Sequence, residues 1–318
     1  MKKITYGIMS TASIVERFVQ AVRASKNGEV VAIASRSLEK AKNKAADLKI
    51  PKSFGSYEEL VSCEEVQVVY IPTINHMHFE NAKLALNHGK HVLLEKPMTL
   101  SEEHTAYLFK LAKKKNLFIM EAQKSVFLPI TIEVKEKIKE GIIGKVHYAR
   151  YTMSYPEVEF DWFYDVNKGG GALYGNAGYI LSHSSYILDQ ELVEPSGQAT
   201  FGNSGIDLAC ILNAKTPEGV LIQGHVTTLL DMVSQAEIYG DRGKITIKDF
   251  WKAREAVIEI SGEQTQKLSH PVDYEMVYEV DHVNACIENG LIVSPVMSDK
   301  RSIDIARKID SYHRDFKG

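Results

Sequence analysis

Cysteine is scarce in this sequence and shows no pairing pattern. The 318 residues include three cysteines, Cys63, Cys210 and Cys286, which lie far apart and form no Cys-x-x-Cys pair. A disulfide framework and a thiolate zinc site are therefore both disfavoured. We expect buried, reduced thiols in a cytoplasmic protein, and no metal site.

Long apolar runs and an excess of one charge are also missing. The apolar run over residues 4–9 is short and interrupted, unlike a secretory signal, and no stretch reaches the roughly 20 apolar residues of a membrane helix. Hydrophobic residues at 44%, charged residues at 25% and a formal net charge of −3 are ordinary for a globular protein. We expect a compact protein with no membrane attachment and no nucleic-acid partner.

The first strand-to-helix turn lacks the glycines of a dinucleotide-binding turn, Gly-x-Gly-x-x-Gly. Its residues are Ser10, Thr11, Ala12, Ser13 and Ile14. The hydroxyl groups and the N–H groups of the helix start still suit a phosphate, and Ala12 adds only a methyl group. On its own, the turn is equally typical of a helix start capped by Ser or Thr.

Strands and helices alternate over the first part of the chain. The apolar pattern predicts strands at 3–9, 30–34, 66–71, 92–94 and 117–121, with helices between them. Such alternation is typical of a doubly wound parallel sheet, which binds ligands at the carboxyl ends of its strands.

The pattern changes after residue 121. Strand-like segments then follow one another at 146–155, 198–201, 208–212, 220–227, 235–239 and 244–247. A short turn joins the last pair, so this part is predicted to form an open, mostly antiparallel sheet. We therefore expect two α/β domains, over 1–121 and 122–318, and the final helix at 299–314 could pack back on the first.

One predicted strand ends in charges. Residues 92–94 are apolar, yet Glu95 and Lys96 follow at once, and Pro97 prevents further pairing. Because charges are costly to bury, we expect Lys96 to project into the ligand crevice. The alternative is a solvated charge pair in a loop.

The end of the second strand bears on the choice of nucleotide. An acidic residue there binds the ribose of NAD, whereas an arginine accommodates the 2′-phosphate of NADP. Ser35 and Arg36 occupy this place, which favours NADP(H) and keeps NAD(H) as the alternative. An exposed arginine that merely opens a helix is the other interpretation.

Several segments together form a recognisable set: Ser10-Thr11-Ala12, Ala34-Ser35-Arg36, Pro72-Thr73-Ile74-Asn75-His76-Met77-His78, Glu95-Lys96-Pro97, Glu121-Ala122 and Gly169-Gly170-Gly171-Ala172-Leu173. The set resembles the Gfo/Idh/MocA oxidoreductases, and within them the dimeric dihydrodiol dehydrogenase-like branch. The resemblance implies an N-terminal Rossmann domain, a substrate and oligomerisation domain over 122–318, and a homodimer formed through its sheet. It also implies nicotinamide-dependent hydride transfer on a small sugar, polyol, diol or related carbonyl.

The same resemblance assigns roles to residues. Lys96 is catalytic, near the nicotinamide, and the residue that moves the proton falls on Tyr179. An Asp is usual four residues earlier, where this chain has Gly175. After Glu121-Ala122 the branch usually has an aromatic residue and then an arginine, where this chain has Lys124 and Val126. His183, one helical turn beyond Tyr179, is the substitute candidate for proton transfer.

The chemistry needs a charge near the tyrosine. Tyrosine has a reference pKa of about 10, so action as a base near pH 7 requires roughly 4 kcal/mol of stabilisation of the phenolate. A neighbouring ammonium supplies part of it, and Lys96 is the expected supplier. The same charge would steady an alkoxide. A core tyrosine is the alternative for Tyr179.

Further candidates complete the predicted site. Cofactor contacts are expected from Thr73, Asn75, His78, Glu95, Lys96 and Gln123, in addition to the first turn, Ser35 and Arg36. Substrate contacts are expected from Lys124, Trp162, Tyr164 and Asn176, although Trp162 and Tyr164 also suit a core or an interface. The spacing of His76 and His78 would allow a metal, but helix capping or cofactor contact is favoured.

Two other function classes stay open. The first is a nicotinamide-nucleotide-binding sensor or regulatory protein with little or no turnover, which Gly175 and Val126 favour. The second is a solute-binding α/β protein that binds no nucleotide.

Overall fold

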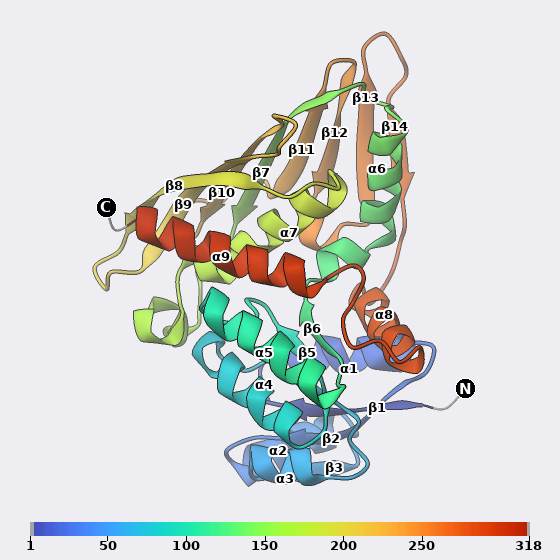
Figure 1. The fold of residues 1–318 in the computed structure, drawn as a ribbon, viewed down its shortest axis with the longest axis vertical. Helices are drawn as coiled ribbons and strands as arrows, with labels where there is room; N and C mark the ends of the chain where they lie inside the picture. Colours follow the sequence, from blue (N-terminus) through green and yellow to red (C-terminus); the bar gives the residue numbers. More distant parts are fainter. Residues whose placement is uncertain (1–2, 317–318) are drawn as a thin grey trace. The chain divides into compact units, whose positions relative to one another are not determined.

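The computed structural model describes residues 3–316, and their contacts divide the chain into two compact units (Figure 1). The first unit comprises the chain up to Ala122 together with Tyr274–Ala306. The second comprises Gln123–Asp273 and the chain from Arg307 onward. A sequence division at residue 121 assigns 274–306 to the C-terminal part, whereas its contacts group it with the N-terminal part.

Polar contacts of helix α8 (Val277–Glu288) explain this grouping. The hydroxyl of Tyr6 donates to Oδ1 of Asn284 at 2.7 Å, and Nδ2 of Asn27 donates to Oε1 of Glu288 at 2.6 Å. These pairs are 278 and 261 residues apart in sequence. No local pattern reports contacts of that separation, so the sequence alone could not place the segment.

The first unit contains a six-stranded sheet in the order β3-β2-β1-β4-β5-β6, and every pair of neighbouring strands is parallel. The strands are β1 (Ile4–Met9), β2 (Gly28–Ala34), β3 (Lys52–Phe54), β4 (Val68–Ile71), β5 (His91–Glu95) and β6 (Ile119–Ala122). The helices between them are α1 (Ile14–Ala24), α2 (Leu38–Asp47), α3 (Tyr57–Ser62), α4 (His78–Asn87) and α5 (Glu102–Lys115). This order is that of a Rossmann sheet, which confirms the predicted doubly wound fold. The strand β3 and the helix α3 were too short to predict.

Helices cover both faces of this sheet. On one face, α3, α4 and α5 share a hydrophobic core with Val69, Ile71 and Leu94. On the other, Phe18 of α1 stacks on Tyr70, with ring centroids 3.6 Å apart. Successive strand residues point to opposite faces, so the continuous apolar runs of β4 and β5 are buried on both sides.

The second unit contains an eight-stranded sheet in the order β14-β13-β12-β11-β7-β10-β9-β8. The β7–β10 pair is parallel and the other pairs are antiparallel, which confirms the predicted mostly antiparallel sheet. The strands are β7 (Val146–Ser154), β8 (Val193–Phe201), β9 (Asp207–Lys215), β10 (Leu221–Thr227), β11 (Gln235–Gly240), β12 (Gly243–Lys248), β13 (Glu255–Ile260) and β14 (Gln266–Ser269). The strands β13 and β14 were not predicted.

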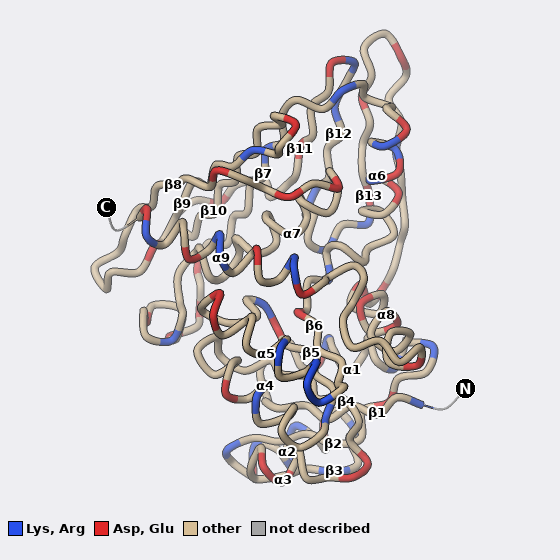
Figure 2. The backbone as a smooth tube through the Cα atoms, in the orientation of Figure 1, with Lys and Arg blue, Asp and Glu red and all other residues tan. Residues whose placement is uncertain are grey.

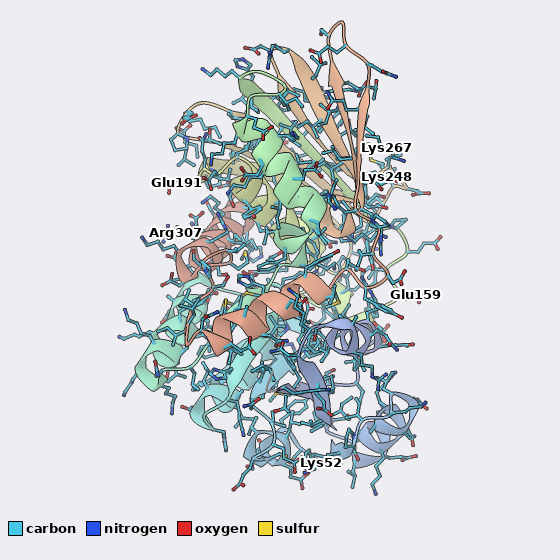
Figure 3. The ribbon with its side chains drawn as sticks, turned by 90° about the vertical axis from the view of Figure 1, so that its right-hand side faces the viewer. Lys52, Glu159, Glu191, Lys248, Lys267 and Arg307 are labelled. Atoms are coloured by element: carbon cyan, nitrogen blue, oxygen red, sulfur yellow. The ribbon has the colours of Figure 1, made fainter. Side chains whose placement is uncertain are left out.

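Helices of the second unit pack on one face of its sheet. They are α6 (Pro129–Lys139), α7 (Gly178–Ile187) and the end of α9 (Asp299–Asp315). Tyr151 of β7 contacts His183 of α7, and the hydroxyl of Tyr312 donates to the carbonyl oxygen of Asn213 in β9 at 2.9 Å. The helix α9 contributes residues to both units, which divide at Arg307, labelled in Figure 3.

Charged residues are spread over both units. Figure 2 shows Lys and Arg interspersed with Asp and Glu along the described backbone, without a block of one sign. Lys267, labelled in Figure 3, lies on the edge strand β14 and pairs with Glu255 at 2.9 Å. None of the helices in the described chain is long and apolar enough to cross a membrane.

Candidate active site

The turn after β1 leads directly into α1. The backbone N–H of Ala12 donates to Oγ of Ser10 at 3.0 Å. Within the described chain, Ser13 makes no side-chain hydrogen bond to the helix it precedes. Ser13 therefore does not occupy the N–H groups of the first turn, which suit an anion.

The turn after β2 carries Ser35 and Arg36. Ser35 is buried, and its Oγ accepts the N–H of Ser37 at 3.3 Å. Arg36 is exposed. Burial raises the pKa of Tyr57, and the positive charge of Arg36 opposes that effect. Arg36 thus acts electrostatically on Tyr57, the first residue of α3.

The turn after β4 is held by His78 at the start of α4. Nδ1 of His78 lies 2.7 Å from the carbonyl oxygen of Pro97, and Nε2 lies 2.9 Å from that of Thr73. Nδ2 of Asn81 donates to Oγ1 of Thr73 at 3.0 Å. Burial lowers the pKa of the His78 ring, against the opposing effect of the two carbonyl contacts. His78 thus connects the turns that follow β4 and β5.

Asn75 and His76 lie in the short helical turn that precedes α4, and Asn75 is buried. Among residues 3–316, no three His, Cys, Asp or Glu side chains gather as a metal site.

The turn after β5 is fixed on several sides. The hydroxyl of Tyr70 donates to Oε1 of Glu95 at 2.6 Å, and Oε2 of Glu95 accepts the backbone N–H of Lys96 at 3.2 Å. The buried carboxylate of Glu121 accepts the N–H of Met98 at 3.0 Å. Lys96 itself is half-buried. Glu95 is therefore tied to a buried tyrosine and to the backbone of Lys96, unlike a solvated charge pair.

The residues after β6 contact α7. Gln123 is fully buried, and its Oε1 accepts the hydroxyl of Ser182 at 3.2 Å. Nζ of Lys124 donates to the hydroxyl oxygen of Tyr179 at 3.0 Å and lies 5.2 Å from the centroid of its ring. Lys124 is 7% exposed and Tyr179 is 6% exposed. The structure thus brings together one predicted substrate residue and one predicted catalytic residue.

His183 has different partners from Tyr179, although the two are one helical turn apart. Its Nδ1 lies 3.1 Å from the hydroxyl of Tyr151, and its ring packs edge-on against Phe250 with centroids 5.1 Å apart. Its buried Nε2 has no hydrogen-bond partner among the described residues. Burial lowers the pKa of His183 to about 3. These surroundings are those of a neutral histidine in the core of the second unit.

The other predicted substrate residues lie in the segment 161–177. Trp162 is half-buried and its ring stacks on that of Phe160, with centroids 6.2 Å apart. Tyr164 is exposed, and its hydroxyl donates to the carbonyl oxygen of Val158 at 3.1 Å. Asn176 is half-buried, one residue beyond Gly175. Each of the two aromatic rings therefore has a local partner.

Sequence reasoning missed Asp207 at the start of β9. Oδ2 of Asp207 accepts the backbone N–H of Leu173 at 2.6 Å, and burial raises the pKa of its carboxyl to about 6. A Cβ on Gly171, whose φ is +95°, would lie 2.1 Å from Oδ1 of Asp207. The glycine run thus lets this carboxylate reach the turn that leads into α7. No signal in the sequence pairs two segments 34 residues apart.

Two family models match this chain. The model described as "Oxidoreductase family, NAD-binding Rossmann fold" matches residues 4–123, and that of the "GFO/IDH/MocA C-terminal domain" matches residues 131–246. The chain belongs to the Gfo/Idh/MocA family of oxidoreductases. It is a nicotinamide-dependent oxidoreductase, as the sequence predicts.

Named relatives agree with this membership. The chain is 31% identical over 318 residues to trans-1,2-dihydrobenzene-1,2-diol dehydrogenase of Xenopus laevis, with 96% of each chain covered. The corresponding Mus musculus enzyme is 30% identical, with 92% and 91% covered. This family member therefore resembles the dihydrodiol dehydrogenase branch along nearly its whole length.

Solved structures share the fold. KijD10, a 3-ketoreductase from Actinomadura kijaniata solved with NADP and TDP-benzene, has a TM-score of 0.90 at 23% identity and covers 99% of this chain and 98% of its own. The aldose-aldose oxidoreductase of Caulobacter crescentus also has a TM-score of 0.90, at 19% identity, with 99% and 98% covered.

Proposed function

We propose that this protein transfers a hydride between NADP(H) and a small hydroxylated or carbonyl substrate of sugar, polyol or diol type, with Lys96 and Tyr179 as catalytic residues. The observation that carries the proposal is the fixed turn after β5, in which Tyr70, Glu95 and Glu121 hold the backbone on both sides of Lys96. A catalytic group needs this kind of support, because small errors of placement cost much of the rate.

We assign nucleotide binding to the first unit. Its residues fit a dinucleotide, since the first-turn N–H groups of α1 are not occupied by Ser13 in the described chain and the exposed guanidinium of Arg36 suits a 2′-phosphate. NADP-bound KijD10 supports the same preference by likeness of fold. The candidate contacts are Ser10, Thr11, Ala12, Ser13, Ile14, Ser35, Arg36, Thr73, Asn75, His78, Glu95, Lys96 and, from the second unit, Gln123.

The cofactor supplies or accepts the hydride. The chain's own residues position the substrate and stabilise the charge that develops on its reacting oxygen. We assign the Lys96 ammonium to stabilising negative charge on the reacting oxygen, an electrostatic role that needs no proton transfer. Tyr179 moves the hydroxyl proton. The name of the Xenopus relative supports a diol as substrate.

Replacement of Lys96 by Ala tests the proposal. We expect turnover to fall by about 100-fold or more, because one preorganised charge at the reacting oxygen is lost. NADPH affinity by fluorescence titration should fall far less, because the other candidate nucleotide contacts remain. Activity is measured with NADPH against dicarbonyls and sugars and with NADP against diols and polyols. Lys113→Ala, at the exposed end of α5, is the control. Equal turnover of the Lys96 variant and the parent would remove the assignment.

A nucleotide-binding sensor with little turnover is the second candidate. Gly175 favours it, because it stands where the resemblance implies a carboxylate. In the described structure a Cβ at this position would meet only Phe163 within 4 Å, so lack of space does not explain the glycine. Tight NADPH binding without turnover on the whole substrate panel would support the sensor.

We further propose a cytoplasmic homodimer formed through the outer face of the second unit's sheet. Arg150 and Glu237 pair on that face, and Met232 and Val233 line a groove beside them. In the loop after β10, the exposed fractions of Leu229, Leu230, Met232 and Val233 are 40–62%. Exposed apolar residues that cluster in this way mark an interaction surface, whereas isolated ones need no explanation. Light scattering on the parent and on Val233→Asp tests this: a monomeric parent would contradict it.

A further inference from the structure

Lys124 is a buried cation placed directly on the hydroxyl of Tyr179. It follows β6 in the turn Lys124–Phe127, and its Nζ donates to that hydroxyl at 3.0 Å. Lys124 is only 7% exposed. A lysine is seldom buried to this extent unless its charge has a partner. This contact lies wholly within the second unit.

The geometry suits a change of charge on the tyrosine. The ammonium occupies one lone pair of the phenol oxygen and leaves the O–H proton to be directed elsewhere. An opposite charge within about 4–6 Å favours the charged form of an ionisable group. When Tyr179 gives up its proton, the phenolate therefore forms against a cation that is already in place.

We propose that Lys124 is the residue that stabilises the phenolate of Tyr179, so that the proton-transfer group of this enzyme is a Lys124–Tyr179 pair. This inference rests on the proposed function. The sequence predicts Lys96 as the cation that stabilises the phenolate, whereas this proposal assigns that role to Lys124. Lys96 retains its proposed role of stabilising negative charge on the reacting oxygen of the substrate.

The pair has a defined part in the reaction. In the reductive direction the substrate's carbonyl carbon accepts a hydride, and its oxygen accepts the proton of Tyr179, so that an alcohol forms as the nicotinamide is oxidised. The phenolate left behind is held by Lys124 and regains a proton from water. In the oxidative direction the same phenolate removes the alcohol proton.

The departure from the related branch supports a role particular to this chain. The resemblance implies an aromatic residue and then an arginine after Glu121-Ala122, whereas this chain has Lys124 and Val126. At these two places this chain has a cation only at Lys124, and that cation contacts the tyrosine hydroxyl.

The test compares Lys124→Met, Tyr179→Phe and the double variant in the full-length protein. We expect the acidic limb of the oxidative kcat/KM profile of Lys124→Met to move up by about 1–3 pH units, with activity recovering at high pH. Lys124→Arg restores most of the parent's profile. In the Tyr179→Phe background, Lys124→Met has no further effect. An equal loss at every pH, or the same loss in both backgrounds, would overturn the pair.

A spectroscopic titration makes the test independent of turnover. The phenolate absorbance of Tyr179 is obtained by subtracting the Tyr179→Phe spectrum from that of the parent across pH, and the same subtraction is made in the Lys124→Met background. We expect a higher midpoint without Lys124, and equal midpoints would refute the inference. This result stands even if Lys96→Ala keeps full turnover and the proposed function fails.

Lys135→Met is the matched control. Nζ of Lys135 lies 4.4 Å from the centroid of the Tyr186 ring, a similar cation and ring in the same unit. Its removal should leave both the pH profile and the Tyr179 titration unchanged. If Lys135→Met shifted them as far as Lys124→Met does, the effect would be one of general charge, against the pair. Circular dichroism and NADPH binding are measured to check that each variant is folded.

Discussion

The hydroxyl of Tyr70 lies 2.6 Å from Oε1 of Glu95, and the other oxygen of that carboxylate accepts the backbone N–H of Lys96. A fully buried aromatic residue of β4 thus orders the residue next to the proposed catalytic lysine. The support for Lys96 comes from a neighbouring strand rather than from its own.

Tyr70→Phe should therefore lower turnover without removing a group that reacts. We expect kcat to fall by about 10-fold, equivalent to 1.4 kcal/mol, and the melting temperature to fall modestly, since a buried hydrogen bond contributes about 1 kcal/mol. Steady-state kinetics and thermal unfolding measure the two effects. Tyr148→Phe, which loses a hydroxyl bond of 3.1 Å to Gln223, is the control. A kcat equal to that of the parent would show that Glu95 is held without Tyr70.

Arg36→Ala should change the choice of nucleotide. A charge-assisted hydrogen bond is worth about 1.5–3 kcal/mol, so we expect NADPH to bind about 10- to 100-fold more weakly while NADH affinity stays within about twofold. Fluorescence titrations with the two nucleotides measure the ratio, and Lys40→Ala on the exposed face of α2 is the control. Equal weakening for both nucleotides would argue against a 2′-phosphate contact.

His183 should make the protein less stable in acid. Because its folded pKa is lowered to about 3 from the ordinary 6.5, the unfolded chain takes up the proton first. The stability that the neutral ring provides is complete above pH 6.5 and is lost as pH falls toward 3. The loss amounts to about 5 kcal/mol across this window.

The difference in unfolding free energy between the parent and His183→Gln, measured by urea titration from pH 7 to 4, isolates this contribution. We expect the difference to shrink as pH falls. A constant difference would mean that His183 titrates normally. Kinetics on the same variant beside Tyr179→Phe compare the two candidates for proton transfer, and we expect the larger loss for Tyr179→Phe.

Gly171→Ala should be far more damaging than Gly175→Ala. The first would place a Cβ 2.1 Å from Asp207 at a φ of +95°, whereas the second would meet Phe163 at 3.6 Å, an ordinary contact. We expect a loss of about 2–4 kcal/mol for Gly171→Ala and a change within about 1 kcal/mol for Gly175→Ala. Melting temperatures compare the variants, and similar values for both would contradict the close approach of Asp207.

Local sequence patterns predicted the parallel sheet of this molecule but not the contacts between residues that are distant in sequence. The parallel sheet followed from apolar runs and caps, such as Ser101, whose Oγ accepts the N–H of His104 at 3.2 Å. The end of β5 followed from charges beside a buried run. The contact of Lys124 with Tyr179 spans 55 residues, and only the tertiary fold creates it. Neither residue's own surroundings in the sequence indicate the other.

The backbone around Lys96 is anchored by His78, Tyr70 and Glu121, which belong to separate elements of one unit. The entropy lost in ordering that loop is lost once, when the chain folds, and not again each time a substrate arrives. Residues that we propose to contact the substrate, such as Asn176, can then be exchanged while the backbone that carries the lysine stays in place. One scaffold of this kind can serve chemically different alcohols.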